Sequence, residues 1–193
     1  LVSGSLRAAA TAVTRPFDAA GEVLDYAGSL RRVVQPPPAT GSPLLRERGL
    51  GRWFGVLEVG LHELRLAAHA AGGSVNDAYI AALLGGFRRY HQAMGAEIGK
   101  VPMGMPINMR SAADPSGGNR IAAVRFAGPA TEADPAKRIR KVRAIVLALR
   151  EEPALDIVEA ASPLLVRLPT RLLAEWYLSQ SSGLDLQASN VAG

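Results

Sequence analysis

The stretch GSVNDAYIAALLGGFRRY, residues 73–90, decides the fold because it carries the marks of a well-defined helix. Ser74 is a suitable N-cap, and Asp77 lies three residues on, where its carboxylate can bond back to the cap. Apolar residues cover nearly every side of this helix until Arg88 and Arg89, which predicts a buried helix. The expected apolar stripe is Val75, Tyr79, Ala82, Leu83 and Phe87.

Two polar side chains, Asn76 and Asp77, stand at the entrance of this apolar helix. The simpler interpretation is that they only cap the helix, since carboxylates and amides satisfy free N–H groups there. The alternative is that they face a substrate. The helix alone leaves both interpretations open.

The chain before this helix predicts an arm rather than a core domain. Residues 6–34 have helical spacing with a break at Pro16, and the three prolines within 35–38 favour an extended polyproline conformation. Residues 39–51 are rich in glycine, proline and charge. We therefore expect a helical arm and linker over 1–51.

The rest of the chain alternates between strand and helix patterns. The expected elements are a strand at 52–59, a helix at 61–71, the helix from Ser74, strands at 101–109 and 120–127, helices at 134–150, 154–168 and 169–178, and a strand at 184–191. Asp134 followed by Pro135 is a strong helix start. This order predicts an α/β (α+β) sandwich with a mixed sheet.

Composition narrows the function classes. The chain has 193 residues, 48% of them apolar, a formal net charge of +5 and no cysteine. Disulfides, thiolate metal sites and a cysteine nucleophile are thus excluded. The positive charge favours anionic partners without choosing among nucleic acid, phosphorylated cofactors and membrane surfaces. The longest apolar run, 78–87, is too short to span a bilayer.

No self-contained catalytic motif is present. His62 and Glu63 begin a zinc-protease signature, but Leu66 stands where its second histidine belongs. His62 and His69 share a helix face without a third ligand, so we expect two partly exposed histidines and no metal site. His91 follows the arginine pair and is expected to be a residue compatible with the negative end of the helix dipole.

One basic cluster stands on the helix that starts after Asp134. Its charged members are Lys137, Arg138, Arg140, Lys141 and Arg143. The simpler expectation is that these charges cover the solvent side while Ile139 and Val142 point inward. The alternatives are contacts to nucleic acid or to the phosphates of a nucleotide-bearing cofactor. No aromatic residues interleave with the charges, which argues against nucleic acid.

The order of short motifs is more informative than any one of them. They are TGSPL at 40–44, SVNDA at 74–78, NMR at 108–110, GNR at 118–120, DP at 134–135 and SNVAG at 189–193. This order resembles the C-terminal half of the bacterial wax ester synthase/acyl-CoA:diacylglycerol acyltransferase family. The resemblance covers about residues 38–193, and the arm is similar to the family's variable inter-domain connector.

The resemblance implies one lobe of a chloramphenicol-acetyltransferase-like fold, in which two α/β lobes face each other across a tunnel. It implies that residues 52–193 form a C-terminal lobe that lacks its last strands. The family's catalytic His, from an H-H-x-x-x-D-G motif of the N-terminal lobe, deprotonates an alcohol that attacks an acyl-CoA thioester. This chain has no adjacent His pair. We therefore expect it to be inactive without that N-terminal lobe.

The resemblance also assigns site residues. Those expected to bind substrate or support the site are Asn76, Asp77, Asn108, Arg110, Gly118, Asn119, Ser189, Asn190, Val191 and Gly193. Ala192 replaces the proline of the family's Ser-Asn-Val-Pro-Gly motif. Lys137, Arg138 and Lys141 are the candidate contacts to the CoA phosphates. No metal and no cofactor are implied, since acyl-CoA is a substrate.

The partners implied are the N-terminal lobe of the same protein, acyl-CoA, and diacylglycerol or a long-chain alcohol, with no nucleic acid. The products would be triacylglycerol or wax ester, made in the cytoplasm or at the surface of the inner membrane or lipid droplets. Two alternatives stay open. One is a lobe of a carrier-protein-dependent condensation or polyketide-associated acyltransferase. The other is a non-enzymatic basic module that binds anionic lipid or nucleic acid.

Overall fold

The computed structural model describes residues 16–108, 121–155, 167 and 169–190. The chain divides into two compact units. One comprises Leu1–Gln35 with Glu152–Arg167, and the other comprises Pro36–Glu151 with Leu168–Gly193. The second unit contains the sheet and also residues 36–51, which the sequence groups with the arm. The domain boundary expected at residue 51 stays a prediction.

The first unit is built on helix α2, Pro16–Val34, within the range expected for the arm. Ser29 is fully buried, donates to Glu152 Oε2 at 2.6 Å and accepts from the backbone N–H of Ala154 at 3.0 Å. Arg32 Nε lies 2.7 Å from Glu152 Oε1. The hydrogen bond from Arg32 lowers the pKa of the Glu152 carboxyl, with Ser29 acting in the same direction. These contacts fix one helix face to the chain at 152–154.

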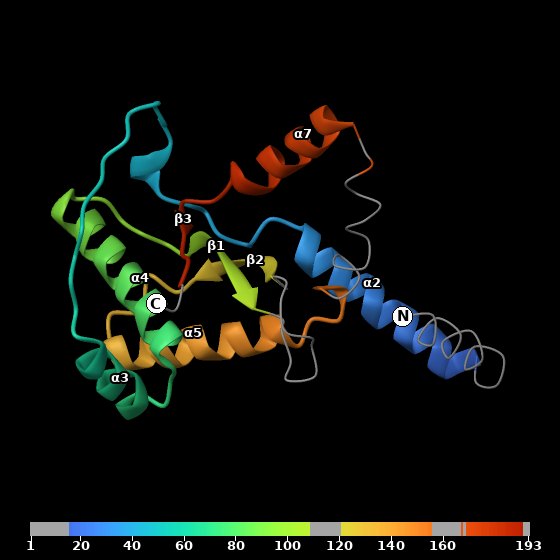
Figure 1. The fold of residues 1–193 in the computed structure, drawn as a ribbon, viewed down its shortest axis with the longest axis horizontal. Coiled ribbons are helices and arrows are strands. Elements are labelled where there is room, and N and C mark those ends of the chain that lie inside the picture. The colour runs from blue at the N-terminus through green and yellow to red at the C-terminus, as the bar shows by residue number, and fades with distance from the viewer. Residues whose placement is uncertain (1–15, 109–120, 156–166, 168, 191–193) are drawn as a thin grey trace. The chain divides into compact units, whose positions relative to one another are not determined.

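The described part of the second unit has a sheet of three strands, which is mixed, as predicted (Figure 1). Strand β1, Val101–Asn108, is central and pairs antiparallel with β2, Ile121–Gly128. Strand β3, Leu186–Gln187, pairs parallel with β1 on its other side. The strand expected at 184–191 is therefore much shorter, because only two of its residues form ladder pairs with β1.

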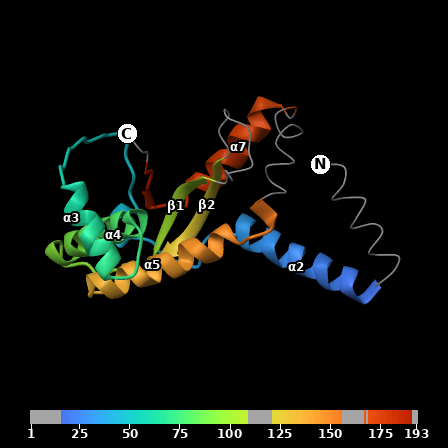
Figure 2. The same ribbon diagram turned by 60° about the horizontal axis from the view of Figure 1, so that its bottom comes forward.

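Three helices of this unit pack against one another on one side of the strands (Figure 2). They are α3, Leu61–Ala70, α4, Val75–Ala93, and α5, Pro135–Arg150. The core they form with the sheet includes Ile80, Leu84, Val101, Met103, Ile107, Val124, Phe126, Ile139, Val142 and Val146. Gly128 packs closely against this core, because a methyl group there would require the ends of the Met103 and Leu84 side chains to shift.

Two further helices complete the described part of this unit. A single 3₁₀ turn, η1, spans Pro43–Leu45. Helix α7 spans Thr170–Ser181 and ends three residues beyond the helix predicted at 169–178. The helix predicted at 154–168 lies almost wholly outside the described residues. Among the helices that are described, none combines the length and hydropathy needed to cross a bilayer.

Two predictions about burial and strands are wrong. Residues 52–59 form no strand in the structure, since no described segment pairs with them. Helix α4 is buried on one face only, and the burial lies on Asp77, Ala78, Ile80, Ala81, Leu84, Gly85 and His91. Ala82 and Leu83 of the expected stripe are exposed instead. The small side chains of Ala78, Ala81 and Gly85 let α5 approach, and this close packing selects their face for burial.

Candidate functional site

The entrance of α4 is held by a capping box, as predicted. The backbone N–H of Ser74 donates to Asp77 Oδ2 at 2.7 Å, and the backbone N–H of Asp77 donates to Ser74 Oγ at 3.3 Å. The Asp77 side chain is buried, and Arg143 of α5 lies 3.5 Å from its Oδ2. All of these contacts fix the helix entrance, so the capping interpretation accounts for Asp77.

Asn76 is different, because its side chain meets a residue far along the chain. Asn190 Nδ2 donates to Asn76 Oδ1 at 3.4 Å, across 114 positions. Asn76 is half-buried and Asn190 is exposed. The Nδ2 donors of Asn76 make no hydrogen bond to the described residues, which leaves them available to a ligand. The structure thus brings together two residues that the motif order had singled out.

A third asparagine, Asn108, lies at the same end of the sheet because of the direction in which the strands run. Asn108 is the last residue of β1, and β3 runs parallel to β1 before the chain reaches Asn190. The backbone N–H of Ala188 still donates to Gly104 O at 2.9 Å, which continues this parallel pairing past β3. Ser189 is exposed beside Asn190. Ligand sites of open α/β sheets typically lie outside the carboxyl ends of parallel strands.

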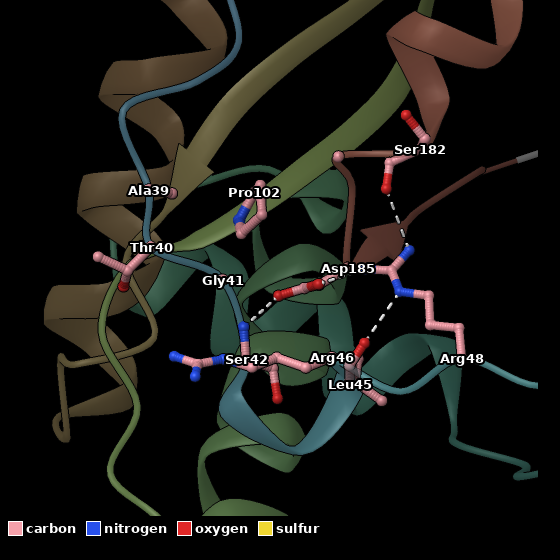
Figure 3. A pocket seen from close by; sticks show the side chains of 11 residues that line it. Ala39, Thr40, Gly41, Ser42, Leu45, Arg46, Arg48, Pro102, Ser182 and Asp185 are labelled. Carbon is pink, nitrogen blue, oxygen red and sulfur yellow. Dashed lines mark hydrogen bonds and ion pairs between the residues drawn. The ribbon is translucent and has the colours of Figure 1, made fainter.

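A hollow of about 430 Å³ lies at the opposite, amino-terminal end of β1 and β3 (Figure 3). Its wall includes Pro102, where β1 starts, and Asp185, just before β3. Asp185 accepts from the backbone N–H of Ser42 at 2.5 Å and from Arg48 Nη2 at 2.6 Å. Arg48 also donates to Leu184 O at 2.9 Å. The connector that carries Ser42 and Arg48 is therefore fixed to the two residues just before β3.

Ser42 also binds the buried end of α4. Its Oγ lies 2.6 Å from His91 Nε2, and His91 Nδ1 lies 2.8 Å from the carbonyl oxygen of Phe87. A carbonyl only accepts, so Nδ1 carries a proton, and in the singly protonated ring Nε2 accepts from Ser42. His91 lies in the last turn of α4, where a residue compatible with the helix dipole was expected, and it is fully buried. Sequence reasoning missed this pair because its members are 49 positions apart.

Two proteins of Mycobacterium tuberculosis, one from strain H37Rv and one from strain CDC 1551, are each 42% identical to this chain over 190 residues. Both are provisionally named diacylglycerol O-acyltransferases. The match covers 98% of this chain. Over nearly its whole length, the chain is thus similar to part of each of these two proteins. This confirms the resemblance inferred from the order of motifs, and the chain spans 38% of the length of these curated relatives.

Neither a family model nor a solved structure matches the chain. The structure itself shows an α/β fold with a small mixed sheet flanked by helices. The more specific chloramphenicol-acetyltransferase-like arrangement stays a prediction.

Helix α5 corrects one expectation about the basic cluster. Arg138 is buried rather than on the solvent side, and it donates to the carbonyl oxygens of Ala81 at 2.8 Å and Glu132 at 2.5 Å. Burial, then the charges of Arg88 and Arg89, lowers the pKa of its guanidinium. Backbone carbonyls accept hydrogen bonds from the Arg138 guanidinium, and the one to Ala81 links α5 to α4. Arg138 is therefore not placed to contact a phosphate.

The other two candidate phosphate contacts are exposed. Lys137 is on the first turn of α5, and Lys141 Nζ lies 2.8 Å from Glu132 Oε2. The hydrogen bond from Lys141 is the largest of the influences that lower the pKa of the Glu132 carboxyl. His62 and His69 of α3 are exposed, as expected. Five predicted site residues lie outside the described residues: Arg110, Gly118, Asn119, Val191 and Gly193.

Proposed function

We propose that this chain is part of an acyl-CoA-dependent O-acyltransferase that esterifies diacylglycerol or a long-chain alcohol. One structural observation carries the proposal, namely the meeting of Asn76 with Asn190 at the carboxyl end of the parallel strands. The kinship supports it, since relatives 42% identical are named diacylglycerol O-acyltransferases. Because the acceptor is a lipid, we expect the enzyme to work at a membrane or lipid-droplet surface.

In this proposal the chain positions the substrate and the base comes from elsewhere. A histidine of an N-terminal lobe, outside these 193 residues, would take the proton of the acceptor hydroxyl. The Asn76 Nδ2 group, which donates to none of the described residues, would donate to a substrate oxygen, and the nearby N-terminus of α4 favours negative charge. Asn190 holds the Asn76 amide in one orientation by donating to its oxygen.

The test compares the isolated chain with a chimera in which it replaces the matching 190 residues of the mycobacterial relative. Both are incubated with a long-chain acyl-CoA and either diacylglycerol or hexadecanol. Thiol release and ester formation are measured together. We expect turnover by the chimera and none by the isolated chain. Turnover by the isolated chain, or a folded chimera with no turnover on either acceptor, would contradict the proposal.

Asn76→Ala in the chimera tests the site itself. We expect turnover to fall roughly tenfold or more, as for loss of one positioned hydrogen-bond donor. The melting temperature should change little, because Asn76 is not the N-cap. Gln92→Ala is the matched control, since it removes an exposed amide from the other end of the same helix. Equal loss of turnover in both variants would exclude a specific role for Asn76.

A further inference from the structure

Residues 52–59, RWFGVLEV, have the composition of a strand without forming one. Trp, Phe and Val are favoured in strands, and this segment has two valines and two aromatic residues. In the structure it is an extended connection between η1 and α3 (Figure 1). The segment therefore has the composition of a strand but is not paired as one in the structure.

The exposure of this segment is unusual on both of its faces. In an extended chain, Trp53 and Leu57 point one way while Phe54 and Val56 point the other way. The four side chains are 93%, 88%, 87% and 94% exposed, respectively. A strand that is apolar on both faces is typical of a sheet covered by other layers on both sides. Residues 52–59 thus have the pattern of an interior strand.

The backbone of the 52–59 segment is also unpaired. No backbone hydrogen bond joins these residues to any other residue that the structure describes. The ends of the segment are nevertheless anchored. Arg48 is tied to Asp185 and Leu184 before it, and the N–H of Leu64 donates to Gly60 O after it, where α3 begins. A segment held extended at both ends is a template for strand addition.

We propose that the 52–59 segment is a β-strand whose partner is a strand from a part of the full-length protein outside these 193 residues. The relatives offer that partner, since the matched residues make up only 38% of their length. The inference rests on this kinship and on the exposed segment. It is independent of the proposed activity.

Two other occupants fit the segment less well. A second copy would add one equivalent strand and leave both apolar faces uncovered, and an isolated two-stranded ribbon is marginal in water. A lipid surface would cover the side chains but not the backbone, and unpaired N–H and C=O groups are costly in a bilayer. A folded domain that supplies both a strand and a covering layer would pair the backbone groups of the segment and also cover its apolar faces.

Hydrogen exchange tests the proposal directly. We compare amide exchange of peptides spanning 50–60 in the isolated chain and in the chimera described above. We expect these amides to exchange roughly 100-fold more slowly in the chimera, because pairing removes them from water. Equal, fast exchange in a folded chimera would overturn the proposal. Protection that grows with concentration of the isolated chain, or appears with liposomes alone, would also overturn it by identifying a second copy or lipid.

A proline variant gives an independent check. Val56→Pro removes a backbone donor from the middle of the segment, whereas Val56→Thr keeps a β-branched side chain. In the chimera, Val56→Pro should abolish the protection and Val56→Thr should keep it. In the isolated chain neither variant should shift the melting temperature. A drop for Val56→Pro in the isolated chain would show that the segment is already paired within it, and would sink the proposal.

The two tests separate this inference from the proposed function. A chimera that protects the 52–59 segment but turns over no acyl-CoA refutes the activity and keeps the strand. A chimera that is active while the segment exchanges freely refutes the strand and keeps the activity.

Discussion

The two ends of helix α4 are stabilised in contrasting ways. At its start, Ser74 and Asp77 satisfy each other within one helical turn. At its end, His91 is held by Ser42, which belongs to the connector before η1. The first arrangement is local in the sequence and the second is not. The start of a helix can thus be predicted from its own sequence, whereas a long-range contact that anchors its other end cannot.

The two ends of α4 also differ in whether their polar groups are available to a ligand. At the start of α4, Asn76 accepts from Asn190 and its Nδ2 group makes no hydrogen bond to the residues that the structure describes, whereas His91 near the end of α4 bonds to other protein groups through both ring nitrogens. A polar group whose partners are all supplied by the protein stabilises the fold. One with unused donors at an accessible position is available for chemistry. We therefore place the candidate site at the start of α4 and a structural anchor at its end.

The largest expected change in stability comes from a substitution of His91, the buried residue near the end of α4. His91→Ala should lower the free energy of unfolding by about 2–4 kcal/mol, because it leaves a cavity and deprives Ser42 of its partner. Urea denaturation measures this. Gln92→Ala, at the exposed neighbouring position, is the control and should change stability by no more than about 0.5 kcal/mol. Similar values for the two variants would mean that the end of α4 is not anchored.

A double-mutant cycle sharpens this result. Ser42→Ala and His91→Ala, separately and together, should show a coupling of about 0.5–3 kcal/mol if the 2.6 Å contact joins connector and helix. Additive effects would indicate that the two residues act independently.

The next largest expected effect is a difference in stability between alanine substitutions at two adjacent glycines of α4, Gly85 and Gly86. Gly85→Ala should destabilise the chain by about 1–3 kcal/mol, because the new methyl would meet the Arg138 guanidinium, which backbone carbonyls hold in place. Gly86→Ala has open space and should stabilise the helix by about 0.5–1 kcal/mol. Thermal unfolding distinguishes them. The same sign for both would refute the close packing of α4 on α5.

A smaller effect is expected at the local end. Ser74→Ala should cost about 1 kcal/mol, the usual value for loss of a capping side chain. Ser74→Asp supplies another good N-cap side chain and should recover part of it. Circular dichroism during urea unfolding gives both values. A loss as large as that for His91→Ala would show that the two ends of α4 do not differ in the way described.

The smallest expected effect depends on pH and lies in the first unit. Arg32 lowers the pKa of Glu152, so the ion pair stabilises the fold above the ordinary pKa of glutamate, about 4.3, and this contribution is lost as the pH falls through the lower folded value. Glu152→Gln should therefore lose less stability than the parent between about pH 5 and pH 3. Thermal melts over this range check the sign. Parallel pH profiles would contradict it.

Much of the local structure was predictable from the sequence. Ser74 with Asp77 marked the start of α4, and Asp134 with Pro135 marked the start of α5, because capping uses residues a few positions apart. The asparagines of the candidate site came from motif order, and the structure joined two of them. Arg138 was misplaced because a basic residue on an amphipathic helix normally faces water, and its carbonyl acceptors come from other segments.

The strand predicted at 52–59 shows a different kind of limit. Trp53, Phe54 and Val56 have high strand propensity, but a strand exists only when another strand pairs with it. Pairing depends on residues far away in the chain. Helices close their hydrogen bonds within a few residues, which is why the helices of the second unit were predicted better than its strands.

The close approach of Arg138 to Gly85 has a consequence for the history of this family. A side chain at position 85 and a full-length arginine at position 138 cannot occupy the same space between α4 and α5. Relatives with alanine or a larger residue at position 85 should therefore carry a shorter residue at position 138. We expect the two positions to have changed together, so that each restricts which substitutions the other has accepted.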